Sequence, residues 1–323
     1  MKKGGILIKN LVLLFAIVFV LDRVFGSILE YYFKKETTGD NAKTRHALTA
    51  VKEDIVIFGS SRAAHHYVPE ELEAATGLTC FNAGRDGMKM TYYKLLLDAI
   101  LSYHKPRVII LDLNYNDLVK EARKDDALIA GILPYIDNKI VNDFVFEHEP
   151  LEGWKARISK LYQFNSKPAT ILHHNMGLGS EHFDGYEPLN GSKLEEGYRV
   201  HVNTSRYTED AELVGRFEEF VSTVKGKGIE LYIVYSPTLM QMKYDYLSTP
   251  KRISEKYGVP LLNYSQFYTL KEKHLFYDKT HMNNEGAKQF THEILGRLVD
   301  TRTPKIAEPR RLKVIKPISL RIE

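Results

Sequence analysis

Two short stretches of the sequence carry the side chains that a serine nucleophile needs. The first is Gly59-Ser60-Ser61, which ends an apolar β-type run from Ile55 to Phe58. The glycine permits a tight turn, and a serine beyond the carboxyl end of a strand stands where open α/β sheets bind their ligands. A serine hydroxyl attacks a carbonyl only when a base removes its proton. Gly-Ser-Ser alone is also the composition of an ordinary loop.

The second stretch, Tyr277-Asp278-Lys279-Thr280-His281-Met282-Asn283, supplies the candidate base, His281. Asp278 stands three residues earlier, so the loop can turn back and let its carboxylate accept the other imidazole N–H. That contact fixes the tautomer of the ring and stabilises the imidazolium during proton transfer. We therefore predict a catalytic set of Ser61, His281 and Asp278. A surface ion pair before a helix is the alternative, and it is commoner for an isolated Asp-x-x-His.

Two further loops offer donors for an oxyanion, which must be in place before the charge develops. One is Asn82-Ala83-Gly84-Arg85-Asp86-Gly87, where Gly87 presents a backbone N–H; the other is Asn114-Tyr115-Asn116-Asp117, where Asn116 presents a side-chain amide. We predict an oxyanion hole of the Ser61 N–H, the Gly87 N–H and the Asn116 amide. Asn114 is the competing amide, because residues i and i+2 of a strand share one face. Taken singly, these residues could also serve only to form a turn or stop a strand.

Together these four stretches resemble the SGNH family of hydrolases and acyltransferases, also called the GDSL family. Gly59-Ser60-Ser61 stands where the family has Gly-Asp-Ser, so Ser61 takes the place of the nucleophile. Asn114 stands where the Gly-x-Asn-Asp block has glycine, and Asp278 to His281 follows the Asp-x-x-His block. The resemblance spans roughly residues 52 to 299. It implies serine chemistry without a metal or an organic cofactor.

The Gly-Ser-Ser-Arg version, an apolar N-terminal segment and the middle of the chain are most similar to the membrane-tethered branch of that family. This branch includes DltD-like and alginate-acetylation-like proteins. The likeness implies an esterase or O-acyltransferase for acylated cell-envelope or secreted carbohydrate, working beside a membrane-bound O-acyltransferase. A plain carbohydrate or lipid esterase would share every catalytic residue. A non-catalytic binding or scaffold protein on the same fold is the third alternative, since fold does not imply function.

Alternating strand and helix patterns must position these loops. The run Val108 to Leu113 is continuously apolar, which is typical of a strand buried on both faces of a parallel sheet. We predict an α/β domain over 51–300, with a doubly wound, mostly parallel, flavodoxin-like sheet and helices on both faces. The alternation lapses between about 120 and 210, which indicates an insertion. The predicted strands are Ile55–Phe58, Thr79–Phe81, Val108–Leu113, Glu230–Tyr235 and Val259–Leu262. The predicted helices are Pro69–Ala75, Met90–Tyr103, Ala211–Val224, Pro250–Tyr257 and a final one that Asn283 caps.

Residues 1–33 predict a membrane anchor. Leu11 to Leu21 is uninterruptedly apolar, and extending the segment to Ile6 and Leu29 gives the length that a bilayer requires. Lysines at positions 2, 3 and 9 favour a cytoplasmic N-terminus, although those at 34 and 35 oppose it. We therefore expect a single-pass protein of the bacterial cytoplasmic membrane with its catalytic domain outside. A cleaved signal peptide is the rival, but no small-x-small site follows the run.

The remaining segments predict no further chemistry. Residues 34–50 are polar and are expected to be a linker, and 301–323 to be a basic tail. A net charge of +4 gives no reason to expect nucleic acid. The single cysteine, Cys80, excludes an internal disulfide and a cysteine-built zinc site. We interpret His173 and His174 as solvated loop residues, and His65 and His66 as part of a loop or helix start. Arg62 and Arg85 are interpreted as rim residues in salt bridges.

Overall fold

The fold is built on a parallel sheet. The computed structural model describes residues 2–119, 124–178 and 184–300, and within them one sheet has five strands in the order β2-β1-β3-β5-β7. Its strands are β1 Ile55–Gly59, β2 Cys80–Asn82, β3 Val108–Asp112, β5 Glu230–Tyr235 and β7 Leu261–Asn263. Every neighbouring pair is parallel. The predicted doubly wound sheet is therefore confirmed.

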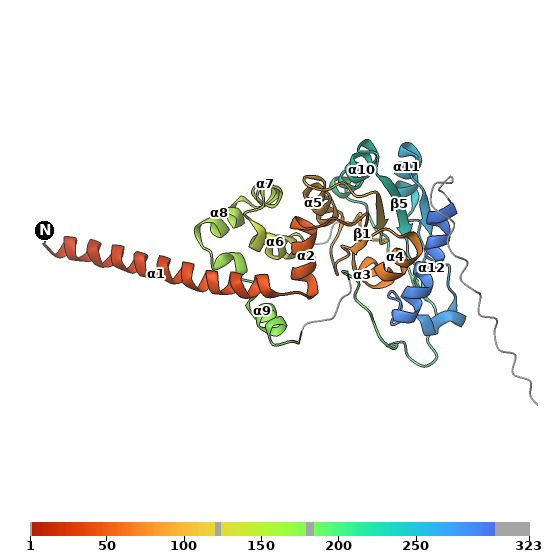
Figure 1. Ribbon diagram of the computed structural model, residues 1–323, viewed down its shortest axis with the longest axis horizontal. Helices are drawn as coiled ribbons and strands as arrows, with labels where there is room; N and C mark the ends of the chain where they lie inside the picture. The colour runs from red at the N-terminus through yellow and green to blue at the C-terminus, as the bar shows by residue number, and fades with distance from the viewer. Residues whose placement is uncertain (1, 120–123, 179–183, 301–323) are drawn as a thin grey trace, which may run out of the picture.

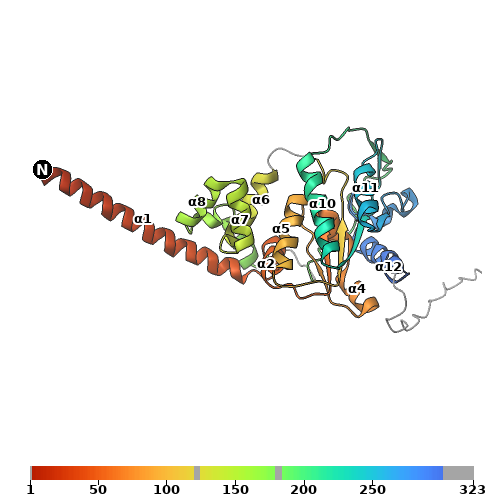
Figure 2. The ribbon, with the colours of Figure 1, turned by 90° about the horizontal axis from the view of Figure 1, so that it is seen from above.

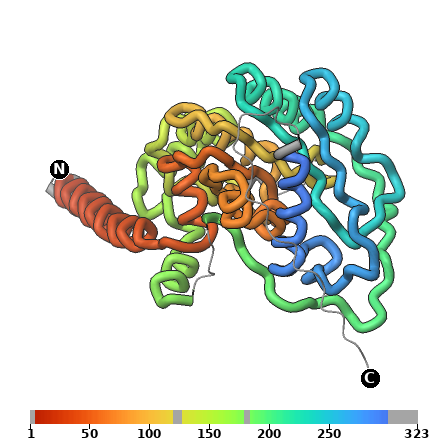
Figure 3. Tube along the Cα trace, turned by 45° about the vertical axis from the view of Figure 1, so that its right-hand side comes forward, coloured from red at the N-terminus to blue at the C-terminus, as the bar shows by residue number. Residues whose placement is uncertain are grey.

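Helices cover both faces of the sheet because alternate residues of each strand point to opposite sides. On one face, Phe58 of β1 packs edge-on against Phe220 at 5.3 Å, within a core to which several helices contribute. They include α2 Gly39–Thr49, α5 Met90–Leu101 and α10 Ala211–Gly226. On the other face, Ile55 and Ile57 belong to a second core. Its helices are α3 Ser61–His66, α4 Pro69–Thr76 and α12 Asn284–Asp300, with α12 lying beside α3 and α4 (Figure 3).

The end of β1 is shaped by Gly59. Its φ is +152°, and a Cβ there would lie 2.7 Å from the carbonyl oxygen of Asp112 on β3. Gly59 and Asp112 are partners in the β1–β3 register. A larger residue would push the two strands apart, so the glycine lets Ser61 begin α3 directly at the carboxyl edge of the sheet.

The insertion between β3 and α10 is largely helical up to Asn175. Its described residues form four α-helices and two 3₁₀ turns: α6 Lys124–Ile132, η1 Leu133–Tyr135, α7 Lys139–His148, α8 Pro150–Ile158, η2 Tyr162–Phe164 and α9 Pro168–Asn175. His173 and His174 lie in α9, so the loop predicted there is wrong. The rest of the domain adds α11 Ser248–Tyr257, η3 Leu270–Leu275, and a small parallel pair of β4 His201–Asn203 and β6 Met240–Met242.

The N-terminal helix α1, Lys2–Lys35, projects from the domain (Figure 1). Its large apolar side chains from Ile6 to Leu21 are all about half exposed or more. The helix is long and apolar enough to cross a membrane. A second view shows α8 of the insertion beside this helix (Figure 2), and η2 and α9 also contact it.

The segment 34–50, which we expected to be a linker, contains the helix α2, and that prediction is corrected here. Lys43 and Thr44 of α2 are almost fully buried. The Lys43 ammonium lies 2.5 Å from Glu187 and also donates to the carbonyl of Gly84, and Thr44 hydrogen-bonds Tyr92. A polar stretch can pack inside a domain when every buried polar group finds such a partner. The predicted tail, 301–323, lies outside the described residues.

Candidate active site

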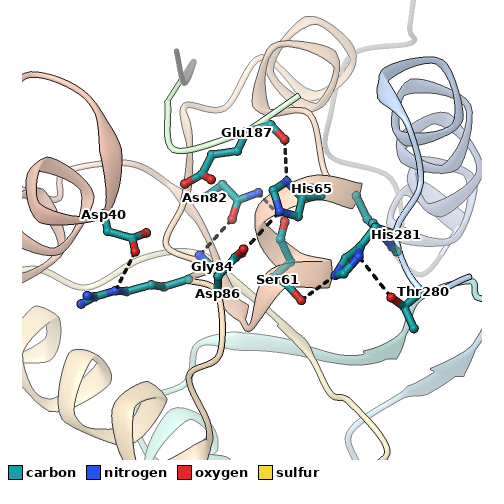
Figure 4. Close-up of polar contacts among 12 residues, drawn as sticks. Asp40, Ser61, His65, Asn82, Gly84, Asp86, Glu187, Thr280 and His281 are labelled. Atoms are coloured by element: carbon teal, nitrogen blue, oxygen red, sulfur yellow. Dashed lines mark hydrogen bonds and ion pairs between the residues drawn. The ribbon is translucent and has the colours of Figure 1, made fainter. Parts of the chain in front are cut away.

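Ser61 opens α3 at the carboxyl edge of the sheet, with Ser60 as the residue before the helix. The Ser61 Oγ lies 2.8 Å from the Nε2 of His281, 220 positions later in the chain (Figure 4). That separation is within the range that a base needs to take the hydroxyl proton. The first half of the predicted set is therefore brought together.

Asp278 completes the arrangement on the other side of the ring. Its carboxylate oxygens lie 2.9 and 3.1 Å from the His281 Nδ1. Since a carboxylate only accepts, Nδ1 carries the proton and Nε2 is free to accept from Ser61. Burial alone would raise the pKa of Asp278, but hydrogen bonds from the His281 ring and from the backbone N–H groups of Thr280 and His281 hold it well below its usual value. Asp278 is therefore a carboxylate at neutral pH.

Hydrogen bonds hold the loop that carries His281 at both of its ends. Phe276 and Met282 form an isolated antiparallel bridge across it. Asn283 accepts from the N–H of Gly286 at 3.0 Å, which confirms it as the cap of α12, and its amide donates to the carbonyl of His274 at 2.7 Å. A base fixed in this way does not lose orientational freedom during reaction.

The glycine loop after β2 is tied to α3 through Asn82, which is fully buried. The Asn82 amide donates to the carbonyls of Ala63 and Tyr67, and its oxygen accepts from the N–H of Gly84. Gly87 follows with φ +71°. Within the described ranges, its N–H has no hydrogen-bond acceptor. Gly87 thus has a donor available, as the predicted oxyanion hole requires, although its role remains a prediction.

The two competing amides, Asn114 and Asn116, follow β3. The Asn116 carbonyl accepts from Lys89 Nζ at 2.9 Å, which holds that residue's backbone. The Asn114 side-chain oxygen instead accepts from the N–H of Tyr115 in its own loop, at 2.9 Å. Asp117 is buried beneath the loop and accepts from the N–H of Asn114 at 2.8 Å. Desolvation raises the pKa of Asp117 to about 7. The assignment of Asn116 to the oxyanion hole remains a prediction.

His65, which we had interpreted as a loop or helix-start residue, lies one helical turn after Ser61. Its Nδ1 faces the Glu187 carbonyl at 2.7 Å, and its Nε2 lies 3.3 Å from the Asp86 carboxylate (Figure 4). Burial lowers the pKa of His65, but the Asp86 carboxylate more than offsets this and the net shift is upward. The pair ties α3 to the turn before Gly87. Its i, i+4 spacing from Ser61 was the available sequence signal.

Arg62 and Arg85 are not at the rim, and that interpretation is corrected. Both are at least nine-tenths buried. Arg62 donates to the carbonyls of Leu113 and Ser236 beneath the site, with Asp112 at 4.0 Å. Arg85 donates to Thr44 at 3.0 Å and lies 3.4 Å from Asp40. Each arginine fastens the segment after a strand to a neighbouring element.

One cluster beside the site has the residue types of a metal centre. Ligand atoms of His65, Asp86 and Glu187 lie within 4.8 Å of one another. However, the Lys43 ammonium already occupies the Glu187 carboxylate at 2.5 Å. A buried cation in that position opposes a second one by direct repulsion.

Comparisons with known proteins give distant likenesses. No protein-family model matches the chain, and no curated protein matches its sequence. Among solved structures, one described as a platelet activating factor from Streptococcus pneumonia is 13% identical and has a TM-score of 0.37, over 84% of this chain and 97% of that one. An acetyl xylan esterase, AlAXEase, is 13% identical with a TM-score of 0.38, over 76% and 99% of the two chains. An acylhydrolase from Bacteroides fragilis is 12% identical with a TM-score of 0.38, over 79% and 93%. Likenesses this distant carry no information about the reaction.

Proposed function

We propose that the protein is a serine esterase or O-acyltransferase that acts on acylated cell-envelope or secreted carbohydrate through an acyl-Ser61 intermediate. The observation that carries this proposal is the chain of contacts from the Ser61 hydroxyl to His281 Nε2 at 2.8 Å and from His281 Nδ1 to Asp278 at 2.9 Å. The three groups come from two distant segments that are each held rigidly. They stand in the order that nucleophilic acyl transfer requires.

The proposed reaction has two half-reactions. As Ser61 Oγ attacks the ester carbonyl carbon, its proton passes to His281 Nε2, and Asp278 stabilises the resulting imidazolium. The carbonyl oxygen becomes an oxyanion held by the N–H groups of Ser61 and Gly87 and by the Asn116 amide. Collapse of this intermediate breaks the ester C–O bond, and His281 returns the proton to the leaving alcohol. Water or a sugar hydroxyl then repeats the steps in reverse and releases Ser61.

The same proposal places α1 in the bacterial cytoplasmic membrane, with its N-terminus inside and the catalytic domain outside. Its length and its exposed apolar surface support a spanning role. A membrane-bound O-acyltransferase is the proposed partner that would supply or receive the acyl group. A reporter that works only outside the cytoplasm, fused after Lys305, should be active. A reporter that is active only in the cytoplasm would reverse the orientation.

The chemistry is tested with a fluorophosphonate probe followed by peptide mapping, which should find the label on Ser61. Failure to label the folded protein would favour a non-catalytic binding role. Unlabelled enzyme from the same preparation is then given an acylated donor with and without a glycan acceptor. Acylated glycan as the product identifies a transferase, and free acid alone identifies the plain esterase.

A further inference from the structure

The helix α8 exposes an apolar face where the insertion meets α1. Leu151, Trp154 and Ile158 recur at i, i+3 and i+7, so they share one side of the helix. Their exposed fractions are 65%, 60% and 69%, and Leu161, just beyond α8, is 40% exposed. We call these four residues the α8 apolar face. A contiguous apolar surface of this kind on a folded domain usually marks a place of contact.

This face is fixed against α1 rather than merely near it. The Asp22 carboxylate of α1 accepts from the Ser159 hydroxyl and from the N–H groups of residues 160 and 161, at 2.5, 2.9 and 3.2 Å. The next residue of α1, Arg23, donates to the carbonyl of Ile158. One turn later, a Cβ on Gly26 would lie 2.8 Å from the backbone N of Leu161. The glycine therefore allows the two backbones to meet, and the end of α8 cannot move independently of α1.

The length of α1 sets the depth of this junction. The freely projecting apolar part, Gly5 to Leu21, is about 17 residues, or roughly 25 Å at about 1.5 Å per residue. A bilayer's hydrocarbon core is about 30 Å thick. The boundary therefore falls about three residues beyond Leu21, near Val24 and Phe25, whose side chains are 49% and 53% exposed. That is the level of α1 at which Asp22 and Arg23 hold residues 158–161.

The Asp22 contacts fit the same depth. A carboxylate at the edge of the hydrocarbon needs hydrogen-bond donors that replace water. The segment 159–161 supplies three of them. The segment that delivers these donors must itself reach the boundary, and it carries Ile158 and Leu161 with it.

We propose that the α8 apolar face is embedded in the membrane interface beside α1. Its occupant is the lipid bilayer, at the boundary between head groups and acyl chains. This rests on the proposed membrane-spanning role of α1. A tryptophan with neighbouring aliphatic residues is typical of segments that lie in this layer. With a second contact besides α1, the domain is held in one orientation over the membrane instead of pivoting on a single helix.

Trp154 provides the test because it is the only tryptophan in the chain. The full-length protein is placed in phosphatidylcholine nanodiscs with and without lipids brominated high on the acyl chain, and Trp154 fluorescence is excited at a wavelength that spares tyrosine. Bromine quenches at short range, so we expect the brominated discs to lower the emission by about half or more. Lipids brominated near the bilayer centre should quench less. The double variant Leu151→Ser/Ile158→Ser should lose most of the quenching.

The matched control moves the reporter to the far end of the molecule. In Trp154→Phe/Phe267→Trp, the new indole replaces an exposed ring in the segment between β7 and η3, and it should not be quenched. Unquenched Trp154 in discs that carry the protein would overturn the proposal while leaving the α1 anchor intact. Protection of Trp154 from acrylamide only after a second membrane protein is added would overturn it as well. Failure of the protein to enter discs would overturn both the anchor and the embedded face.

Discussion

In the part of the chain that the structure describes, two sets of serine, histidine and aspartate are hydrogen-bonded to one another, and the pattern of hydrogen bonds differs between them. In the first, Ser61 faces His281 Nε2 and Asp278 faces Nδ1. In the second, the Ser236 hydroxyl donates to Asp112 at 2.7 Å and faces His66 Nδ1 at 3.1 Å. The backbone N–H of Met282 donates to His66 Nε2 at 3.0 Å. Both sets lie at the carboxyl edge of the sheet, and His66 is within 6.4 Å of His281, ring to ring.

The difference lies in where the serine proton goes. His66 Nε2 is already occupied by a backbone donor, so His66 has no free lone pair to serve as a base. The Ser236 proton is committed to a carboxylate instead. His66 and Ser236 are completely buried, and burial holds the pKa of His66 well below its usual value. Residue types alone therefore do not make a nucleophile; connectivity and access do. The second set helps to position the first, because His66 accepts a hydrogen bond from the backbone N–H of Met282, the residue after His281.

The largest expected effect is on kcat, and it distinguishes Ser61 from Ser236. Ser61→Ala or His281→Ala should lower kcat by about 10⁶-fold, as removal of the nucleophile or base does in serine proteases. Ser236→Ala should still label with a fluorophosphonate, because its hydroxyl cannot be activated. Probe labelling and steady-state kinetics on one model ester make the comparison. Loss of labelling in Ser60→Ala with retention in Ser61→Ala would move the nucleophile by one residue.

The two aspartates should also differ in function. Asp278→Asn should cost up to about 10⁴-fold in kcat, because the wrong histidine tautomer is then favoured. That loss should be smaller than the loss for His281→Ala, since Asp278 never carries the transferred proton. Asp112→Asn should affect kcat far less. An Asp278→Asn enzyme with near-normal kcat would show that Asp278 and His281 form only a surface ion pair.

The next largest effect on kcat is expected at the proposed donors of the oxyanion hole. Asn116→Ala should lower kcat by about 10²–10³-fold with KM nearly unchanged, since its amide meets charge that exists only in the transition state. Asn114→Ala should change kcat much less, because its side-chain oxygen is turned back onto the N–H of Tyr115. The reverse pattern would mean that the hole is built around Asn114. Slow labelling of Ser61 should survive in both variants.

The first set could be predicted from the sequence, whereas the second set and the packing of α2 could not. The strands and the loops of Ser61, His281 and Asp278 were predictable, because each is a local pattern at the end of an apolar run. The second set was not, since Asp112 closes an apolar strand and Ser236 follows another without any motif. The burial of α2 was missed for a similar reason. Lys43 is polar in sequence, and its partner Glu187 lies 144 positions away.

A smaller effect concerns stability. Ser236→Ala leaves a buried Asp112 oxygen without its 2.7 Å donor and His66 Nδ1 without an acceptor. An unsatisfied buried group typically costs about 1–3 kcal/mol. We expect the free energy of unfolding to fall by that amount. We expect kcat to fall only severalfold, because His66 would then hold the backbone of Met282, next to His281, less firmly. Urea unfolding in detergent, followed by circular dichroism, measures the first; unchanged stability would mean that the hydrogen bonds of the second set are not formed in solution.

The smallest expected effect is that the stability contributions of Asp278 and Asp112 change in opposite directions with pH. Hydrogen bonds and the His281 ring outweigh desolvation and hold the pKa of Asp278 well below its usual value, whereas desolvation raises the pKa of Asp112 despite the nearby Arg62. A depressed folded pKa stabilises above the unfolded value of about 3.9 and loses that stabilisation as the pH falls below it. A raised folded pKa stabilises fully below about 3.9 and loses that stabilisation as the pH rises.

The stability cost of Asp278→Asn should therefore shrink as the pH falls from about 5 toward 3. The stability cost of Asp112→Asn should instead shrink as the pH rises from about 4 toward 7. Unfolding free energies of the two variants and the wild type across this range provide the measurement. Parallel trends for both variants would show that the two carboxylates share one environment, and the contrast between the two sets would be lost.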